Sequence, residues 1–239
     1  DVVINLAGEP IANKRWTDEQ KHRIEYSRWS ITEDIVTLIN AGENPPKLLI
    51  SGSAIGFYGR QKDNIIDENF SSSHDEFSHR LCERWETIAK KAQSDKTRVC
   101  ILRTGVVITK RGGALQKMLL PFKLGLGGPM GDGSQYMSWI HLEDMLQGIA
   151  HLIANDSCQG VYNFTAPNPV TNAEFSRELA ASLSRPCVFK VPEFVLRMMM
   201  GEMADLVLYG QRVVPTRLEE SGYKFIYPKI SQALDCLRK

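Results

Sequence analysis

Long hydrophobic runs alternate with amphipathic patterns through the first two-thirds of the chain. The runs are "VVINL" (residues 2–6), "KLLISGSAIGFYG" (47–59), "RVCILRTGVVI" (98–108) and "GVYNFTA" (160–166). An apolar run without regular polar alternation is typical of a strand in a parallel sheet that is covered on both faces. We therefore predict four strands, and we expect the first of them to be buried rather than half exposed.

Helical patterns lie between these runs. The capping-box pair Thr17 and Gln20 predicts a helix start, and the segment 40–42 predicts its end. The apolar face of this helix is predicted to be Ile24, Ile31, Ile35 and Leu38. Further helices are predicted at about residues 75–93 and 141–156. The alternation of strand and helix indicates right-handed crossovers and an α/β fold with a doubly wound parallel sheet.

The character of the chain changes after about residue 166. Thr171 and Glu174 form a second capping box, and most of the remainder has helical rather than strand signals. Met198, Met199 and Met200 are expected to form a buried helix face. We therefore divide the chain into an α/β domain at residues 1–166 and a small, mainly helical C-terminal subdomain at residues 167–239.

Composition excludes several classes of function. The 239 residues are 43% hydrophobic and carry a net charge of +1, so no global field attracts nucleic acid or an anionic membrane. No apolar run approaches the roughly 18 residues of a membrane span. The odd number and scattered positions of the cysteines argue against a disulfide framework or a zinc site, and favour the cytoplasm. They are Cys82, Cys100, Cys158, Cys187 and Cys236.

Small, hydrogen-bonding residues end the first three predicted strands. These ends are residues 5–8 ("NLAG"), 51–54 ("SGSA") and 103–107 ("RTGVV"). In open α/β sheets, ligands bind outside the carboxyl ends of the strands, and small residues let a ligand approach the backbone. Ordinary turn chemistry explains any one of these segments, but all three in register favour a binding site.

The same segments resemble the extended, epimerase-like branch of the short-chain dehydrogenase/reductases. "NLAG" is similar to that superfamily's Asn-x-Ala-Gly element, "ISGSA" to its Ser-bearing strand end, "LRTGVV" to its nicotinamide loop, and "WIHLEDM" to its Phe-Ile-His-Val-x-Asp element. Longer strings such as "LCERWE" and "LPFKLGLGGPMGDG" resemble the bacterial epimerase family proteins of the YfcH type. The resemblance covers essentially the whole chain.

This resemblance implies a Rossmann fold that binds NADP(H), with NAD(H) as an alternative. The family's Gly-x-x-Gly-x-x-Gly phosphate loop is not among these residues, and we expect it to precede Asp1, so that residues 1–166 form part of a Rossmann domain. The Gly-rich segment 125–133 is no substitute, because its spacing is wrong and no strand leads into it. We expect that segment to be a loop on the substrate side. The residues implied to bind the cofactor are Leu6, Ala7, Gly8, Arg23, Arg28, Ser51, Gly52, Thr104, Gly105 and Val107.

Two arginines of the first helix are included for their charge. Arg28 stands where the family has an Asn close to the nucleotide, and a guanidinium there could bind a ribose or phosphate oxygen in a bidentate way. Arg23 lies five residues earlier and shares that flank only loosely. The alternative for both is an ordinary solvated helix arginine.

The catalytic residues are harder to assign. The family uses a Tyr-x-x-x-Lys pair on one helix together with a Ser that orients the substrate, and Ser53 matches this Ser. Alignment through "LCERWE" puts Phe77 and Leu81 at the Tyr and Lys positions, where neither side chain can transfer a proton. Tyr58 and His79 are the remaining candidates for the proton donor, although His79 is rotated by about 200° from Phe77 on the helix.

Other constellations are weaker. A metal site built from His141, Glu143 and Asp144 is disfavoured, because His141 and Glu143 would point to opposite faces of an extended chain, so no metal is expected. A hydrolase elbow is disfavoured because Gly56 comes one residue late after Ser53. We therefore predict an NADP(H)-binding oxidoreductase or nucleotide-sugar-epimerase-like enzyme whose small-molecule substrate is a nucleotide sugar or another carbonyl compound. A non-catalytic NADP(H)-dependent sensor is the alternative, and a homodimer remains open.

Overall fold

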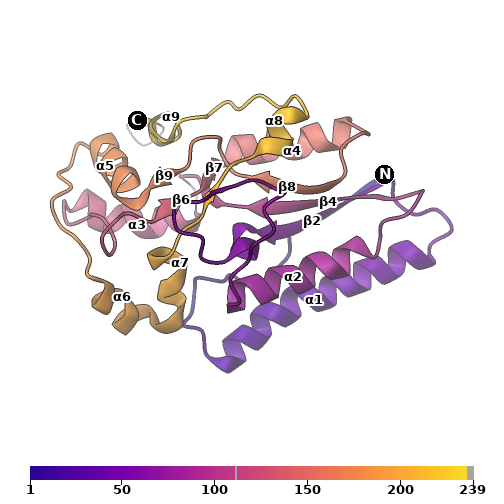
Figure 1. Cartoon of the computed structure of the whole chain (residues 1–239), viewed down its shortest axis with the longest axis horizontal. Helices are drawn as coiled ribbons and strands as arrows, with labels where there is room; N and C mark the ends of the chain where they lie inside the picture. Colours follow the sequence, from indigo (N-terminus) through magenta and orange to yellow (C-terminus); the bar gives the residue numbers. More distant parts are fainter. Residues whose placement is uncertain (111, 236–239) are drawn as a thin grey trace.

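A parallel four-stranded sheet forms the centre of the computed structural model, which describes residues 1–110 and 112–235 (Figure 1). Its strand order is β1-β2-β4-β8, and all neighbouring pairs are parallel. The bounds are Val2–Asn5 for β1, Leu48–Ala54 for β2, Arg98–Thr104 for β4 and Gly160–Phe164 for β8. The predicted α/β class and parallel sheet are confirmed.

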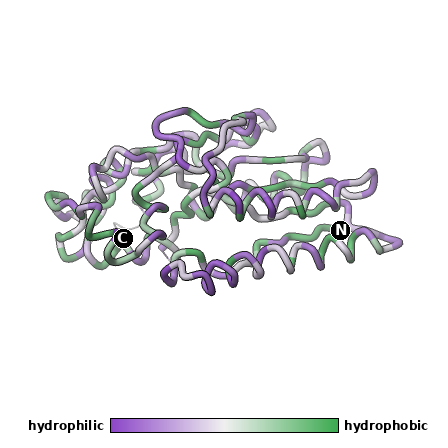
Figure 2. The backbone as a smooth tube through the Cα atoms, turned by 60° about the horizontal axis from the view of Figure 1, so that its bottom comes forward, coloured by the Kyte–Doolittle hydropathy of each residue, from purple (hydrophilic) through white to green (hydrophobic). Residues whose placement is uncertain are grey.

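Helices cover both faces of this sheet, as a doubly wound fold requires. Helices α1 (Asp18–Ala41) and α2 (Phe77–Lys90) lie on one face, and α4 (Leu142–Ala154) and α8 (Thr216–Glu220) lie on the other (Figure 1). Each face buries its own apolar layer. The colours of Figure 2 alternate along the helical turns, as expected for helices that bury one side.

The remaining elements are short. They are η1 (Ile55–Tyr58), β3 (Ile65–Ile66), β5 (Val106–Ile108), α3 (Gly113–Lys123), β6 (Tyr136–Met137), β7 (Trp139–His141), β9 (Val170–Thr171), α5 (Asn172–Ser182), α6 (Glu193–Met200), η2 (Gly201–Ala204), α7 (Asp205–Leu208), β10 (Arg212–Val213) and α9 (Ile230–Leu234). Strands β5 and β7, β3 and β10, and β6 and β9 form three separate pairs. The C-terminal part is mainly helical, as predicted.

Both predicted capping residues start helices. The Thr17 hydroxyl accepts a hydrogen bond from the Gln20 backbone N–H (3.2 Å) before α1, and Thr171 does the same for Glu174 (3.2 Å) before α5. These bonds satisfy N–H groups that the first turn leaves free. The two helix starts could therefore be located from sequence alone.

Two sequence predictions about burial are wrong, and a third is only partly right. Strand β1 is the edge of the sheet, so Val2 and Ile4 are exposed rather than buried. On α1 the predicted Ile24 is buried and Ile35 packs against the core, but Ile31 and Leu38 are 38% and 74% exposed. The other buried positions of this helix are Gln20, Thr32, Val36 and Ile39. In α6 only Leu196 is buried, and Met198 and Met199 face outward with 68% and 67% exposure. The predicted methionine face of α6 is therefore a surface.

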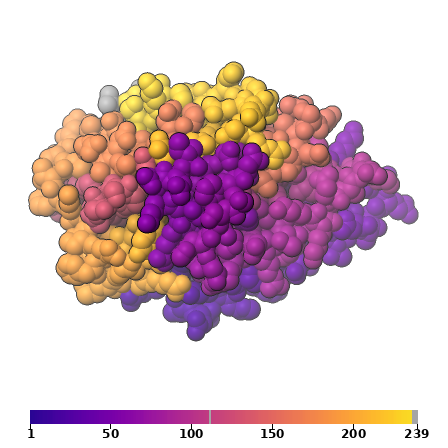
Figure 3. All heavy atoms as spheres, in the orientation of Figure 1, coloured from indigo at the N-terminus to yellow at the C-terminus, as the bar shows by residue number. Residues whose placement is uncertain are grey.

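The segment after β2 connects the sheet to the C-terminal part. In Figure 3 this purple segment covers the middle of the visible face and meets the orange and yellow C-terminal residues. Strand β3 pairs with β10, and the Glu68 carboxylate accepts the backbone N–H groups of Asn163 (2.9 Å) and Arg217 (3.2 Å). Residues far apart in sequence thus share one buried polar layer.

Candidate functional site

The carboxyl ends of the first three sheet strands meet at one edge. Asn5 is in register with Ser51, and Ala54 is in register with Thr104. Three of the predicted segments (residues 5–8, 51–54 and 103–107) therefore lie side by side. Parallel strands place equivalent ends together, which is why ligand sites form there.

The turn after β1 is fixed to α1 by a short hydrogen-bond network. The Asn5 side-chain oxygen accepts the backbone N–H of Ala7 (3.2 Å), and the Asn5 amide donates to the Thr32 hydroxyl (3.0 Å). Trp85 of α2 donates its indole N–H to the same hydroxyl (2.9 Å). This network holds the Ala7–Gly8 backbone in place, while Leu6 remains exposed beside it.

Arg28 lies directly above this turn. A Cβ on Gly8 would come within 2.8 Å of the Arg28 Cζ, so glycine is what allows this close approach. The Arg28 Nη1 donates to the carbonyls of Glu9 and Ile24, both at 3.1 Å. Among the described residues, its Nε and Nη2 have no protein acceptor. Burial lowers the pKa of this arginine. A half-buried guanidinium with donors left free of protein acceptors is suited to an anionic ligand.

Arg23 is arranged differently. Its side chain is 56% exposed and forms an ion pair with Glu19 (2.5 Å), one turn away on α1. Nothing in this geometry directs Arg23 toward the strand ends. The geometry therefore favours the simple alternative of a solvated helix arginine, and its contact with a cofactor stays a prediction.

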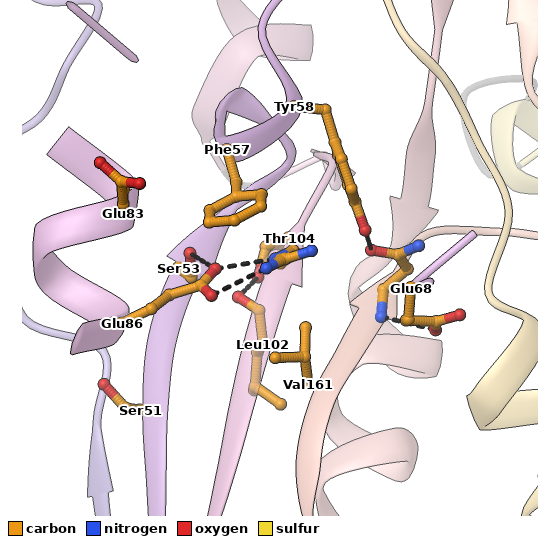
Figure 4. A network of polar contacts seen from close by, with 12 residues as sticks. Ser51, Ser53, Phe57, Tyr58, Glu68, Glu83, Glu86, Leu102, Thr104 and Val161 are labelled. Carbon is orange, nitrogen blue, oxygen red and sulfur yellow. Dashed lines mark hydrogen bonds and ion pairs between the residues drawn. The ribbon is translucent and has the colours of Figure 1, made fainter. Parts of the chain in front are cut away.

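The Ser53 hydroxyl belongs to a buried ionic network (Figure 4). It donates to Oε1 of Glu86 (2.8 Å), and Arg103 donates to both oxygens of the same carboxylate, each at 2.8 Å. Burial alone would lower the pKa of Arg103, but its hydrogen bonds and ion pair with Glu86 outweigh this effect and raise it. The Arg103 guanidinium also lies 3.4 Å from the centre of the Phe57 ring. Sequence reasoning missed Glu86 and Arg103.

The packing of α2 favours a different face toward Ser53 from the one that the sequence alignment suggested. Phe77 and Leu81 do not face Ser53, because they pack against Ile24 of α1 in a separate apolar cluster that includes Trp16. The residues that follow each of them face the strand end instead. Ser78 lies against Gly56, and the buried Cys82 thiol contacts the Ser53 side chain. Ser78 and Cys82 are four residues apart on this face of α2, and neither is a Tyr or a Lys.

Tyr58 and His79 are both directed away from Ser53. The Tyr58 ring is fully buried, and its hydroxyl donates to Oδ1 of Asn163 (2.7 Å). Burial raises the pKa of Tyr58, and Arg103 opposes this shift. The His79 ring contacts the Phe57 carbonyl through Nδ1 (2.5 Å) and packs on the Phe57 ring. These contacts give Tyr58 and His79 packing roles away from Ser53. Ser53 is therefore the best placed of the three candidates.

Several of the predicted cofactor-binding residues also have packing roles. A Cβ on Gly52 would meet the Trp85 ring at 3.0 Å, and one on Gly105 would meet the Ser138 carbonyl at 2.6 Å. The contact at Gly105 coincides with the break between β4 and β5, so the run predicted as one strand forms two. Val107 packs against the core, while Ser51 is buried within β2 and Thr104 ends β4.

The sequence matches two known families. Residues 1–164 match the NAD dependent epimerase/dehydratase family, and residues 191–237 match a domain of unknown function (DUF1731). The chain belongs to the NAD-dependent epimerase/dehydratase family. The chloroplastic epimerase family protein SDR39U1 homolog of Arabidopsis thaliana is 43% identical over 97% of this chain and 67% of its own length. The epimerase family protein Mb2239 of Mycobacterium bovis is 41% identical over 98% of this chain and 77% of its own length.

Solved structures of this epimerase family are similar throughout the chain. The human epimerase family protein SDR39U1 (isoform 2), crystallised with NADPH, superposes with a TM-score of 0.96 at 34% identity, over 100% of this chain and 81% of its own. A nucleoside-diphosphate sugar epimerase from Corynebacterium glutamicum gives a TM-score of 0.80 at 31% identity, over 100% of this chain and 46% of its own. The resemblance to the extended short-chain dehydrogenase/reductases is therefore confirmed.

The residues considered as metal ligands in this epimerase-family chain have structural roles instead. His141 caps α4 by accepting the Glu143 backbone N–H (3.2 Å), and the Asp144 carboxylate binds backbone N–H groups near the C-terminus. Within residues 1–110 and 112–235, no group of three His, Cys, Asp or Glu side chains is placed to hold a metal ion. No helix in that described part is long and apolar enough to cross a membrane. Cys236 lies outside the described residues.

The Gly-rich loop packs against the C-terminal part. Gly125 faces Pro186, Gly128 lies close to the Phe189 backbone, and Met130 forms an isolated bridge with Val191. Its expected place on the substrate side stays a prediction. The contacts explain why glycines recur there, since side chains would collide with the neighbouring backbone.

Proposed function

We propose that this epimerase-family protein binds NADP(H) at the edge formed by β1, β2 and β4. The observation that carries the proposal is Arg28, whose Nε and Nη2 have no acceptor among the described residues and which lies over the Gly8 backbone. A phosphate or ribose oxygen would satisfy these donors. The NADPH-bound human relative, 34% identical over the whole chain, supports the same cofactor.

We further propose that the protein is an oxidoreductase or an epimerase-like enzyme for a small molecule with a carbinol or carbonyl group. The bound nicotinamide would supply hydride transfer. Ser53 stands at the end of β2 and would hold the reacting oxygen of the substrate by a hydrogen bond. The buried Glu86 and Arg103 keep the Ser53 side chain in one orientation. A nucleotide sugar is one substrate class, in line with the Corynebacterium relative.

The first test is titration of the protein with NADPH and NADH, followed by fluorescence. Arg28→Ala is expected to weaken NADPH binding by roughly tenfold or more, because a charge-assisted hydrogen bond is lost. Arg84→Ala is the matched control. Arg28 lies 5.3 Å from the centre of the Trp85 ring, and Arg84, another helix arginine, lies 4.1 Å from that of Trp29 but is 58% exposed. Equal affinity of wild type and Arg28→Ala would contradict the role of Arg28, and no binding of either nucleotide would contradict the proposal itself.

A non-catalytic NADP(H)-dependent sensor is the second candidate. It is favoured by Cys82, which contacts Ser53, and by Ser78 one turn earlier on α2, because neither is the Tyr or Lys of the family's acid–base pair. The absorbance of NADPH during incubation with carbonyl compounds and sugar nucleotides separates the two functions. Oxidation of NADPH by any of these compounds supports the enzyme. Binding without oxidation across the panel supports the sensor.

A further inference from the structure

Glu86 and Arg103 form a charged pair in the interior of the molecule. Their side chains are 1% and 5% exposed, and the two hydrogen bonds between them are each 2.8 Å long. Such a pair requires that both charges and the remaining lone pairs be satisfied, since desolvation is costly. The Glu86 carboxylate accepts one more hydrogen bond, from the hydroxyl of Ser53, the proposed substrate-binding residue.

The direction of each hydrogen bond in this group is fixed by chemistry. A guanidinium has only donors, and an ionised carboxylate has only acceptors. Arg103 therefore donates to Glu86, and Ser53 must donate its single proton to Glu86 as well. The Lys90 ammonium lies 3.6 Å from Oε2 and is a further cation beside this carboxylate.

This hydrogen bond to Glu86 determines what the Ser53 oxygen can offer to a ligand. Once its proton is committed to Glu86, the Ser53 oxygen has only lone pairs left to offer. Cys82, which contacts Ser53, is a weak donor that can occupy one of them. A ligand that reaches Ser53 is therefore met by an acceptor. A carbonyl oxygen, which is also an acceptor, cannot form a hydrogen bond with it.

We propose that Glu86, paired with Arg103, is a positioning residue that makes Ser53 a hydrogen-bond acceptor, so that the site selects an alcohol hydroxyl over a carbonyl. This inference rests on the proposed function, because it takes the Ser53 end of β2 as the place where substrate binds. It narrows the substrate class: the form held at rest carries a hydroxyl group at the reacting carbon. The carbonyl form is the one that the site releases.

The test compares two probes of nearly equal shape, cyclohexanol and cyclohexanone. Cyclohexanol is titrated into the NADPH complex and cyclohexanone into the NADP⁺ complex, so that neither pair can react by hydride transfer. Dissociation constants are measured by calorimetry or by nucleotide fluorescence. Wild type is expected to bind the alcohol roughly tenfold or more tightly than the ketone, since an unpaired buried acceptor is unfavourable.

Variants separate positioning from a purely structural role. Glu86→Gln has nearly the same shape but supplies both a donor and an acceptor, so the alcohol-to-ketone ratio is expected to fall toward one. Ser53→Ala is expected to abolish the preference, and Ser53→Thr, which keeps the hydroxyl, to retain it. Glu83→Gln, an exposed carboxylate on the same helix, is the matched control. A structural role alone would weaken both probes together and leave the ratio unchanged.

The outcomes distinguish this inference from the proposed function. Failure of wild type to bind NADPH contradicts the proposed function. If NADPH binds but the ketone binds as tightly as the alcohol, or the alcohol does not bind at all, the inference is overturned while the cofactor assignment stands. An unchanged ratio in a folded Glu86→Gln variant overturns the role of Glu86.

Discussion

The Arg28 guanidinium lies so close to Gly8 that any side chain at residue 8 would collide with it. A Cβ there would be 2.8 Å from Cζ and 3.0 Å from Nη1. The two residues therefore form one unit, in which the small residue sets the position of the large cation. This relationship links a strand end to a helix 20 residues later in the sequence and leads to a direct test.

Gly8→Ala is expected to weaken NADPH binding by roughly tenfold, because the methyl group displaces Arg28 from its position over the turn. Fluorescence titration measures the affinity, and thermal unfolding measures the stability, which is expected to change little by comparison. Gly42→Ala, at the end of α1 with ordinary backbone angles, is the control. Unchanged affinity in Gly8→Ala would show that the position of Arg28 does not matter for the nucleotide.

Arg103→Ala is expected to lower the free energy of unfolding by roughly 3–5 kcal/mol, because it leaves the Glu86 charge buried without its main partner. Urea unfolding measures this loss. The double variant Arg103→Met with Glu86→Met is expected to lose less free energy of unfolding than the sum of the losses in the single variants Arg103→Met and Glu86→Met. The double variant removes both charges together, so neither is left buried alone. The exposed pair Asp75 and Arg80 is the control, and Asp75→Asn is expected to cost under about 1 kcal/mol. Strict additivity at Arg103 and Glu86 would contradict the pairing.

Stability is expected to fall at alkaline pH because of Cys82. Burial raises the pKa of this thiol from 9.0 to about 11. A thiol whose pKa is higher in the folded state contributes stability below pH 9, and this contribution is lost as the pH rises from about 9 to about 11. Urea unfolding at pH 8 and pH 10 should show that wild type loses roughly 1 kcal/mol more than Cys82→Ala. Parallel losses in the two proteins would argue against a buried, neutral thiol.

Asp144→Ala is expected to loosen the C-terminal segment. This fully buried carboxylate accepts the Tyr223 hydroxyl (2.9 Å) and the backbone N–H groups of Ile226 (2.7 Å) and Tyr227 (2.9 Å). Its removal leaves buried donors without partners, at a cost of roughly 3 kcal/mol or more. Hydrogen exchange should accelerate at the amides of Ile226 and Tyr227. Glu143→Ala, its less buried neighbour, serves for comparison, and equal exchange in both variants would count against this anchor.

Sequence reasoning succeeded where the signal is local. Thr17 and Thr171 start helices because a hydroxyl and an N–H three residues later need no information from the rest of the chain. The three strand ends were located because small residues after hydrophobic runs are also a local pattern. The family could be recognised from the same segments, and the matching residues 1–164 confirm it.

It failed where tertiary contacts decide the outcome. The sequence alignment led us to expect Phe77 and Leu81 beside Ser53, whereas both pack against Ile24 of α1. One residue rotates a helical side chain by about 100°, which is enough to exchange Phe77 for Ser78. Glu86 and Arg103 looked like ordinary charged residues because their partnership joins a helix to a strand. Met198 was expected to be buried from its hydrophobicity, but only the packing of α6 determines which side is covered.

The buried layer around Tyr58 constrains how the protein acquires its structure during synthesis. Tyr58 hydrogen-bonds Asn163, which lies 105 residues later, and Asn163 in turn donates to the Val214 carbonyl (3.0 Å). The ribosome must therefore release most of the chain before the interior of the first half can satisfy its polar groups. Contacts of such long sequence separation form slowly. The interior of the N-terminal half is therefore expected to be completed only after the segment around Val214 has been synthesised.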